Sequence, residues 1–102
     1  MTIINSMSEL EKIKNILREH KLELKEKYNV KEIGIFGSYV HDDFDTSSDI
    51  DILVEFSEPI GWEFIDLKDE LEELLGKDID LVTKDALKPR IKPNIMKDVV
   101  YA

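Results

Sequence analysis

The fold of this chain is decided between Ile33 and Phe56, where the sequence reads IGIFGSYVHDDFDTSSDIDILVEF. Two runs rich in β-branched and aromatic residues flank a turn-rich segment, which predicts two strands joined by a loop. The loop opens with Gly37-Ser38, and ten residues later the second strand opens with Asp49-Ile50-Asp51. Side chains on a strand alternate between faces, so Asp49 and Asp51 point the same way with Cα atoms roughly 6.5 to 7 Å apart. Two carboxylates placed in this way can grip one cation.

A third carboxylate follows downstream. Asp80 lies in the otherwise apolar run Ile79–Thr83, which predicts a further strand. Mg²⁺ takes hard oxygen ligands and is usually held by one or two carboxylates plus substrate phosphates. A third carboxylate on a neighbouring strand would complete a two-metal site for in-line displacement. Gly37 lets the backbone approach a phosphate, and Ser38 and nearby amides can donate to its oxygens. Together the pattern predicts a metal-dependent nucleotide site.

The spacing of Gly37-Ser38, ten residues, then Asp49-Ile50-Asp51 resembles the signature of the minimal nucleotidyltransferases of the polymerase-β-like superfamily. The lead-in Ile33–Phe36, the Ile79–Thr83 run and the closing Ala86–Pro89 fit the same pattern, so the resemblance spans nearly the whole chain. It implies an α+β fold, a small mixed sheet flanked by helices.

Members of this family are typically antitoxins encoded beside a HEPN-domain toxin, and some transfer AMP from ATP to a toxin tyrosine. The resemblance therefore implies a HEPN toxin as partner, ATP as substrate and two Mg²⁺ ions as cofactors. It also implies that Asp49, Asp51 and Asp80 are the catalytic, metal-binding carboxylates. Gly37 and Ser38 would contact the phosphates.

One departure from the family pattern keeps other functions open. Family loops commonly read Gly-Ser-x-Ala-Arg-Gly, whereas this loop has His41 and Asp42 in place of the arginine and glycine. Histidine is mostly neutral at pH 7, so either the loop binds phosphate more weakly than an arginine-containing loop, or residues outside the loop bind the phosphate. A non-catalytic antitoxin that covers the toxin's active site is the first alternative. Nucleotidyl transfer to a small molecule is the second, and the lack of room for a second domain disfavours it.

Composition narrows the functional classes further. The chain has 102 residues, enough for a single domain spanning 1–102, and contains no cysteine for a disulfide or thiolate metal site. No signal peptide or membrane span is visible, so we expect a cytoplasmic protein. Residues 41–80 hold 15 acidic and 2 basic side chains. That stretch suits cations or a basic partner, and makes nucleic acid an improbable direct ligand.

The remaining pattern predicts the other elements. A helix starts near Ser8, with a possible break near His20, and a second helix runs from about Trp62 to a stop at Gly76. Pro89 and Pro93 fit helix starts, and Ile95 to Val100 suggests a short final helix. Tyr39 could stack on a base. We expect an exposed apolar patch around Trp62, Phe64 or the segment from Ile95 to Tyr101 to dock a partner.

Overall fold

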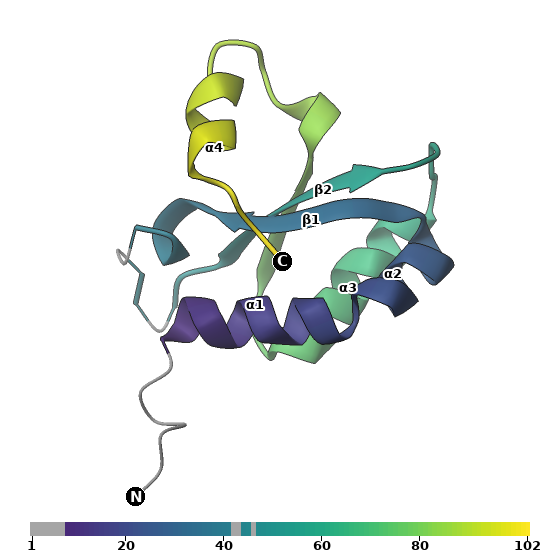
Figure 1. Ribbon diagram of the computed structural model, residues 1–102, viewed down its shortest axis with the longest axis horizontal. Helices are drawn as coiled ribbons and strands as arrows, with labels where there is room; N and C mark the ends of the chain where they lie inside the picture. Colours follow the sequence, from purple (N-terminus) through teal and green to yellow (C-terminus); the bar gives the residue numbers. More distant parts are fainter. Residues whose placement is uncertain (1–7, 42–43, 46) are drawn as a thin grey trace, which may run out of the picture.

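The computed structural model describes residues 8–41, 44–45 and 47–102. Helices and strands alternate in a mixed order along the chain (Figure 1). The regular elements are α1 (Glu9–Glu19), α2 (Lys21–Tyr28), β1 (Val30–Phe36), β2 (Ile50–Phe56), α3 (Glu63–Leu75), β3 (Ile79–Thr83), α4 (Lys92–Asp98) and β4 (Val100–Tyr101). Short 3-10 turns follow two of the strands, η2 (Gly37–Tyr39) after β1 and η3 (Lys84–Ala86) after β3.

The predicted helix boundaries are confirmed at three points. The Ser8 hydroxyl accepts a hydrogen bond from the Glu11 backbone N–H at 3.1 Å, so Ser8 is the N-cap of α1. His20 lies between α1 and α2, where the helical pattern breaks. Gly76 adopts a left-handed conformation (φ +67°) directly after α3, which lets the helix end there.

The four strands form one mixed sheet in the order β3-β2-β1-β4. Strand β2 runs antiparallel to β1 and parallel to β3, and β4 runs antiparallel to β1. The pairing places Phe36 opposite Asp51, and Asp51 opposite Asp80. The register therefore brings the end of β1 and the starts of β2 and β3 to one end of the sheet.

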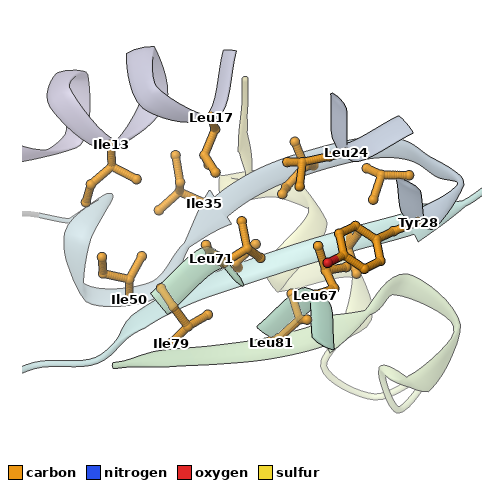
Figure 2. Close-up of a cluster of buried hydrophobic side chains, with 14 of the residues drawn as sticks. Ile13, Leu17, Leu24, Tyr28, Ile35, Ile50, Leu67, Leu71, Ile79 and Leu81 are labelled. Carbon is orange, nitrogen blue, oxygen red and sulfur yellow. The ribbon is translucent and has the colours of Figure 1, made fainter. Parts of the chain in front are cut away.

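Helices α1, α2 and α3 cover one face of the sheet, and α4 lies on the other side (Figure 1). The hydrophobic core fills the space between the three helices and the sheet (Figure 2). Leu17, Leu24, Leu67 and Leu71 of the helices are fully buried there, against strand residues such as Ile35. This arrangement confirms the predicted α+β fold with a small mixed sheet flanked by helices.

The prediction for the C-terminal segment was partly wrong. Pro93 does lie in the first turn of α4, but Pro89 lies in a turn, and the helix ends at Asp98. Val100 and Tyr101 then form β4 against Gly34 and Ile35. Gly34 permits this crossing, because a Cβ at that position would lie 2.6 Å from Val99 Cγ1. The pairing is a long-range event that the local pattern does not contain.

Two large apolar side chains at the start of α3 stand in solvent. Trp62 is 84% exposed and Ile65 is 52% exposed. Phe64, by contrast, packs against the core with its ring edge-on to Phe56. None of the helices in the described ranges is long and apolar enough to span a bilayer.

Candidate active site

The three predicted carboxylates lie at one end of the sheet. Asp51 and Asp80 are paired neighbours on the parallel strands β2 and β3, so they lie on the same face, away from the core. Asp51 is half-buried and Asp80 is exposed. Asp49 is also exposed and lies one residue before β2. The structure thus joins Asp51 and Asp80 directly and leaves Asp49 at the rim.

The position of Asp51 perturbs its ionisation. Burial raises the pKa of Asp51 to about 6, and the negative charge of Asp80, its hydrogen bond with Asp80 and the charge of Asp49 add to that increase. The Ser38 backbone N–H acts in the opposite direction, because it donates to the carboxylate. Ionised Asp51 therefore lacks sufficient compensation from the protein's own groups at neutral pH. A bound cation would supply that compensation.

Gly37 and Ser38 pack directly against Asp51. Gly37 starts η2 with φ +77°, a left-handed conformation that L-residues with a side chain rarely adopt. A Cβ at this position would also collide with the Asp51 carboxylate. Sequence reasoning assigned Gly37 and Ser38 to phosphate contacts and missed this contact with Asp51. The glycine-serine turn is thus in direct contact with the carboxylate of Asp51 on β2.

A stacked aromatic pair stabilises the loop between Ser38 and Asp49. The Tyr39 ring stacks on Phe44 with centroids 4.2 Å apart and planes 7° from parallel. Its hydroxyl lies 3.4 Å from the Ser48 carbonyl, to which it donates. Tyr39 is only 2% exposed, so the prediction that it could stack on a base was wrong. Asp42 of the loop falls outside the described residues.

The donor set suits a hard cation but is not a closed cage. Carboxylate oxygens are the ligands that Mg²⁺ prefers, and Asp51 and Asp80 offer them side by side. Across residues 8–41, 44–45 and 47–102, no three His, Cys, Asp or Glu side chains are grouped to hold a metal ion. Mg²⁺ sites of nucleotide enzymes commonly use one or two carboxylates and complete the shell with phosphate and water. The pair fits that type of site.

Comparison with known proteins agrees with this geometry. The model of the nucleotidyltransferase domain family matches residues 17–102. The chain belongs to this nucleotidyltransferase family. A protein adenylyltransferase, MntA, of Thermococcus cleftensis is 48% identical over 97 residues, covering 94% of this chain and 98% of the relative.

Solved structures extend the comparison. One provisionally named a minimal nucleotidyltransferase superposes with a TM-score of 0.75 at 30% identity, covering 92% of this chain and 95% of the other. This agreement confirms the predicted membership of the minimal nucleotidyltransferases. A chain from a complex of a tri-AMPylated HEPN toxin with an MNT antitoxin of Shewanella oneidensis is 22% identical, with a TM-score of 0.56. The match covers 91% of this chain and 67% of that one, and it shows the fold alone.

In this nucleotidyltransferase the side chain of His41, which stands where the family commonly has arginine, contacts a residue that sequence reasoning missed. His41 Nε2 lies 3.0 Å from Asp98 Oδ2 at the end of α4. The His41 backbone N–H also donates to the Gly37 carbonyl at 3.3 Å. His41 is exposed, as predicted for a turn residue, but it ties the glycine-serine turn to the C-terminal helix. The two partners are 57 positions apart in the sequence, so no local pattern contains this contact.

Proposed function

We propose that this nucleotidyltransferase is a Mg²⁺-dependent protein adenylyltransferase that transfers AMP from ATP to a tyrosine hydroxyl of a HEPN toxin. Modification would neutralise the toxin, so the chain would act as an antitoxin, in the cytoplasm. One observation carries the proposal: Asp51, the strand neighbour of Asp80, is packed against the turn formed by Gly37 and Ser38. The residues proposed to hold a cation and those proposed to bind phosphate thereby lie together at one end of the sheet.

The residues divide the chemistry between them. Ser38 and the backbone of the Gly37 turn would hold the terminal phosphates of ATP. The tyrosine oxygen would attack the α-phosphorus, the bond from that phosphorus to the oxygen bridging to the β-phosphate would break, and pyrophosphate would leave. A tyrosine hydroxyl has an unperturbed pKa of about 10 and needs a base. Exposed Asp80 is open to an incoming tyrosine and would accept its proton.

Magnesium fits the carboxylates that the chain provides. Asp49, Asp51 and Asp80 would hold the ions, and a cation there would offset the burial and the neighbouring carboxylates that raise the pKa of Asp51 to about 6. When bound, Mg²⁺ would offset the charge of the phosphates and polarise the α-phosphorus. The positions of the ions depend on the nucleotide, because two carboxylates alone leave most of a Mg²⁺ shell to phosphate and water.

The partner is proposed from the relatives. The relative from Thermococcus cleftensis is a protein adenylyltransferase, which supports a protein as the AMP acceptor. The Shewanella oneidensis structure holds an AMPylated HEPN toxin together with its MNT antitoxin, which supports a HEPN acceptor. Tyrosine is the acceptor that the resemblance to this family implies.

A non-catalytic antitoxin is the second candidate, and His41 favours it. Its imidazole faces Asp98 at 3.0 Å, where an arginine would offer a permanent cation to phosphate. Growth protection separates the two candidates. Cells that express a HEPN toxin should be rescued by the wild-type chain and by the control Asp78→Asn. They should not be rescued by the triple variant Asp49→Asn/Asp51→Asn/Asp80→Asn, although that variant still binds the toxin. Equal rescue by the triple variant would show protection by occlusion.

A further inference from the structure

Helix α2 separates two grooves of opposite charge on the side of the molecule that faces away from the candidate active site. Lys21, Leu22 and Lys25 of α2 line the first groove, and Glu23 and Lys27 of α2 line the second. The sorting follows from helix geometry, because residues three or four apart share a face. Lys21 and Lys25 therefore point to one flank of α2, and Glu23 points to the other flank together with Lys27.

The first groove, called the basic groove here, has a volume of about 730 Å³. Its charged lining residues are all cations: Arg18, Lys21, Lys25 and Lys31. Of these, Arg18, Lys25 and Lys31 form no ion pair with any residue that the structure describes. Leu22 stands among them and is 67% exposed.

The second groove, called the acidic groove here, lies between α2 and α3 and has a volume of about 430 Å³. It is lined by five acids: Glu23, Asp66, Asp69, Glu70 and Glu73. Glu70 Oε1 accepts hydrogen bonds from Lys27 Nζ at 2.6 Å and from the Tyr28 hydroxyl at 2.8 Å. Within the described ranges the other four acids have no ion-pair partner. Four unpaired negative charges thus lie across α2 from four positive ones.

We propose that this surface binds a second copy of the chain in a two-fold symmetric dimer centred on α2. A two-fold axis that runs parallel to α2 in the plane of contact exchanges the two flanks, so the basic groove of each copy faces the acidic groove of the other. Such a patch is self-complementary, which is the condition for a closed two-fold interface. The acids at 66, 69 and 73 recur at helical steps of three and four along α3, and Lys21 and Lys25 lie one such step apart on α2. Leu22 supplies an apolar anchor beside the axis.

Nucleic acid is a poorer occupant for the basic groove. A phosphate backbone offers nothing to cover exposed Leu22, and it would be repelled by the acidic groove across α2 and by the net charge of −9. The dimer would also leave catalysis unobstructed. Helix α2 covers one face of the sheet, whereas Asp51 and Asp80 lie on the other (Figure 1). Each copy in the pair would keep an open site.

Sedimentation equilibrium of the full chain with charge-reversed variants tests the dimer. One variant carries Arg18→Glu, Lys25→Glu and Lys31→Glu, which makes both grooves acidic. The other carries Asp66→Lys, Asp69→Lys and Glu73→Lys, which makes both grooves basic. The matched control carries Lys88→Glu, Arg90→Glu and Lys97→Glu, which reverses three exposed cations outside the patch. Circular dichroism verifies that each variant is folded. Salt near 0.15 M, with a Debye length of about 8 Å, screens the repulsion between whole copies but spares contacts across the grooves.

The wild-type chain and the control are expected to dimerise between about 10 and about 200 µM, the range of a modest interface. Each reversed variant alone should associate at least tenfold more weakly. An equimolar mixture of the two should recover the dimer, since every groove then faces its opposite charge. A wild-type chain that stays monomeric throughout would overturn the proposal. So would unchanged dimerisation of the reversed variants, a mixture that fails to recover, or growth into chains longer than a dimer.

Discussion

Replacing Asp51 with asparagine should make the metal-free protein more stable. Asn keeps the size of the side chain and can still accept the Ser38 N–H, but it removes a half-buried charge that Asp80 and Asp49 oppose. In the proposed function, the charged form of Asp51 binds the cation. The substitution therefore separates the contribution of Asp51 to cation binding from its effect on folding stability.

The magnitude follows from the ionisation of Asp51. Its pKa rises from 3.8 to about 6 in the folded chain. Each pKa unit corresponds to about 1.4 kcal/mol, so the ionised side chain costs up to about 3 kcal/mol at pH 7.5. Solvent screening lowers that figure, and we expect Asp51→Asn to raise the free energy of unfolding by about 1 to 3 kcal/mol. A domain of this size gains about 4 to 8 °C in Tm per kcal/mol.

The pH dependence has a defined sign. Because the folded-state pKa of Asp51 exceeds its unfolded value, the folded chain binds the proton more tightly. The wild-type chain should therefore gain stability from this group as the pH falls from above 6 towards 3.8. Asp51→Asn lacks that dependence. The stability difference between the two proteins should be largest at pH 7.5 and small at pH 4.

Urea unfolding in EDTA at several pH values measures this difference. Asp78→Asn is the matched control, because it removes an exposed carboxylate just before β3 and should leave stability nearly unchanged. Adding Mg²⁺ and AMP-PNP should reverse the ranking, with only the wild-type chain strongly stabilised. A loss of stability in metal-free Asp51→Asn at pH 7.5 would refute the reasoning.

Three further substitutions, two of them paired with a comparison variant, test the fold and the site. Gly37→Ala should cost at least about 1 to 2 kcal/mol in urea unfolding and abolish nucleotide binding in calorimetry, because of its φ of +77° and the collision with Asp51. Gly76→Ala, with φ +67° and open space around the added methyl group, should show only the stability cost. Leu71→Ala should lose about 2 to 5 kcal/mol in the same unfolding assay, whereas exposed Leu22→Ala should lose little. Glu70→Gln should lose about 1 kcal/mol near pH 7. The Lys27 hydrogen bond lowers the pKa of Glu70, so that deficit should vanish as unfolding is repeated at pH values falling below the ordinary range of glutamate.

Much of the fold follows from local pattern. Ile50, Ile52 and Val54 alternate with residues on the opposite face of the strand, and this alternation alone predicts β2 and the face that carries Asp51. The break at His20 and the stop at Gly76 are also local signals. Strand β4 could not be predicted in this way. It has two residues, and it forms because Gly34, far away in the sequence, leaves room for the crossing chain.

The candidate site also combines features that the sequence predicts with contacts that it does not. The spacing of Gly37, Asp51 and Asp80 in the sequence predicts that the carboxylate pair and the glycine-serine turn lie close together. The contact between Gly37 and Asp51 depends on the antiparallel register that places Phe36 opposite Asp51. The approach of His41 to Asp98 depends on where α4 packs. Both are tertiary contacts between distant segments, so no single stretch of sequence contains them.

The intact mass of a HEPN partner after incubation with the chain, ATP and Mg²⁺ tests the central claim most directly. We predict that the wild-type chain adds whole AMP units to the partner and that peptide mapping locates them on tyrosine. Asp80→Asn should abolish the mass gain while the complex still forms, because the carboxylate acts on the hydroxyl and not on docking. A partner that is bound and neutralised by the wild-type chain without any gain in mass would contradict the account.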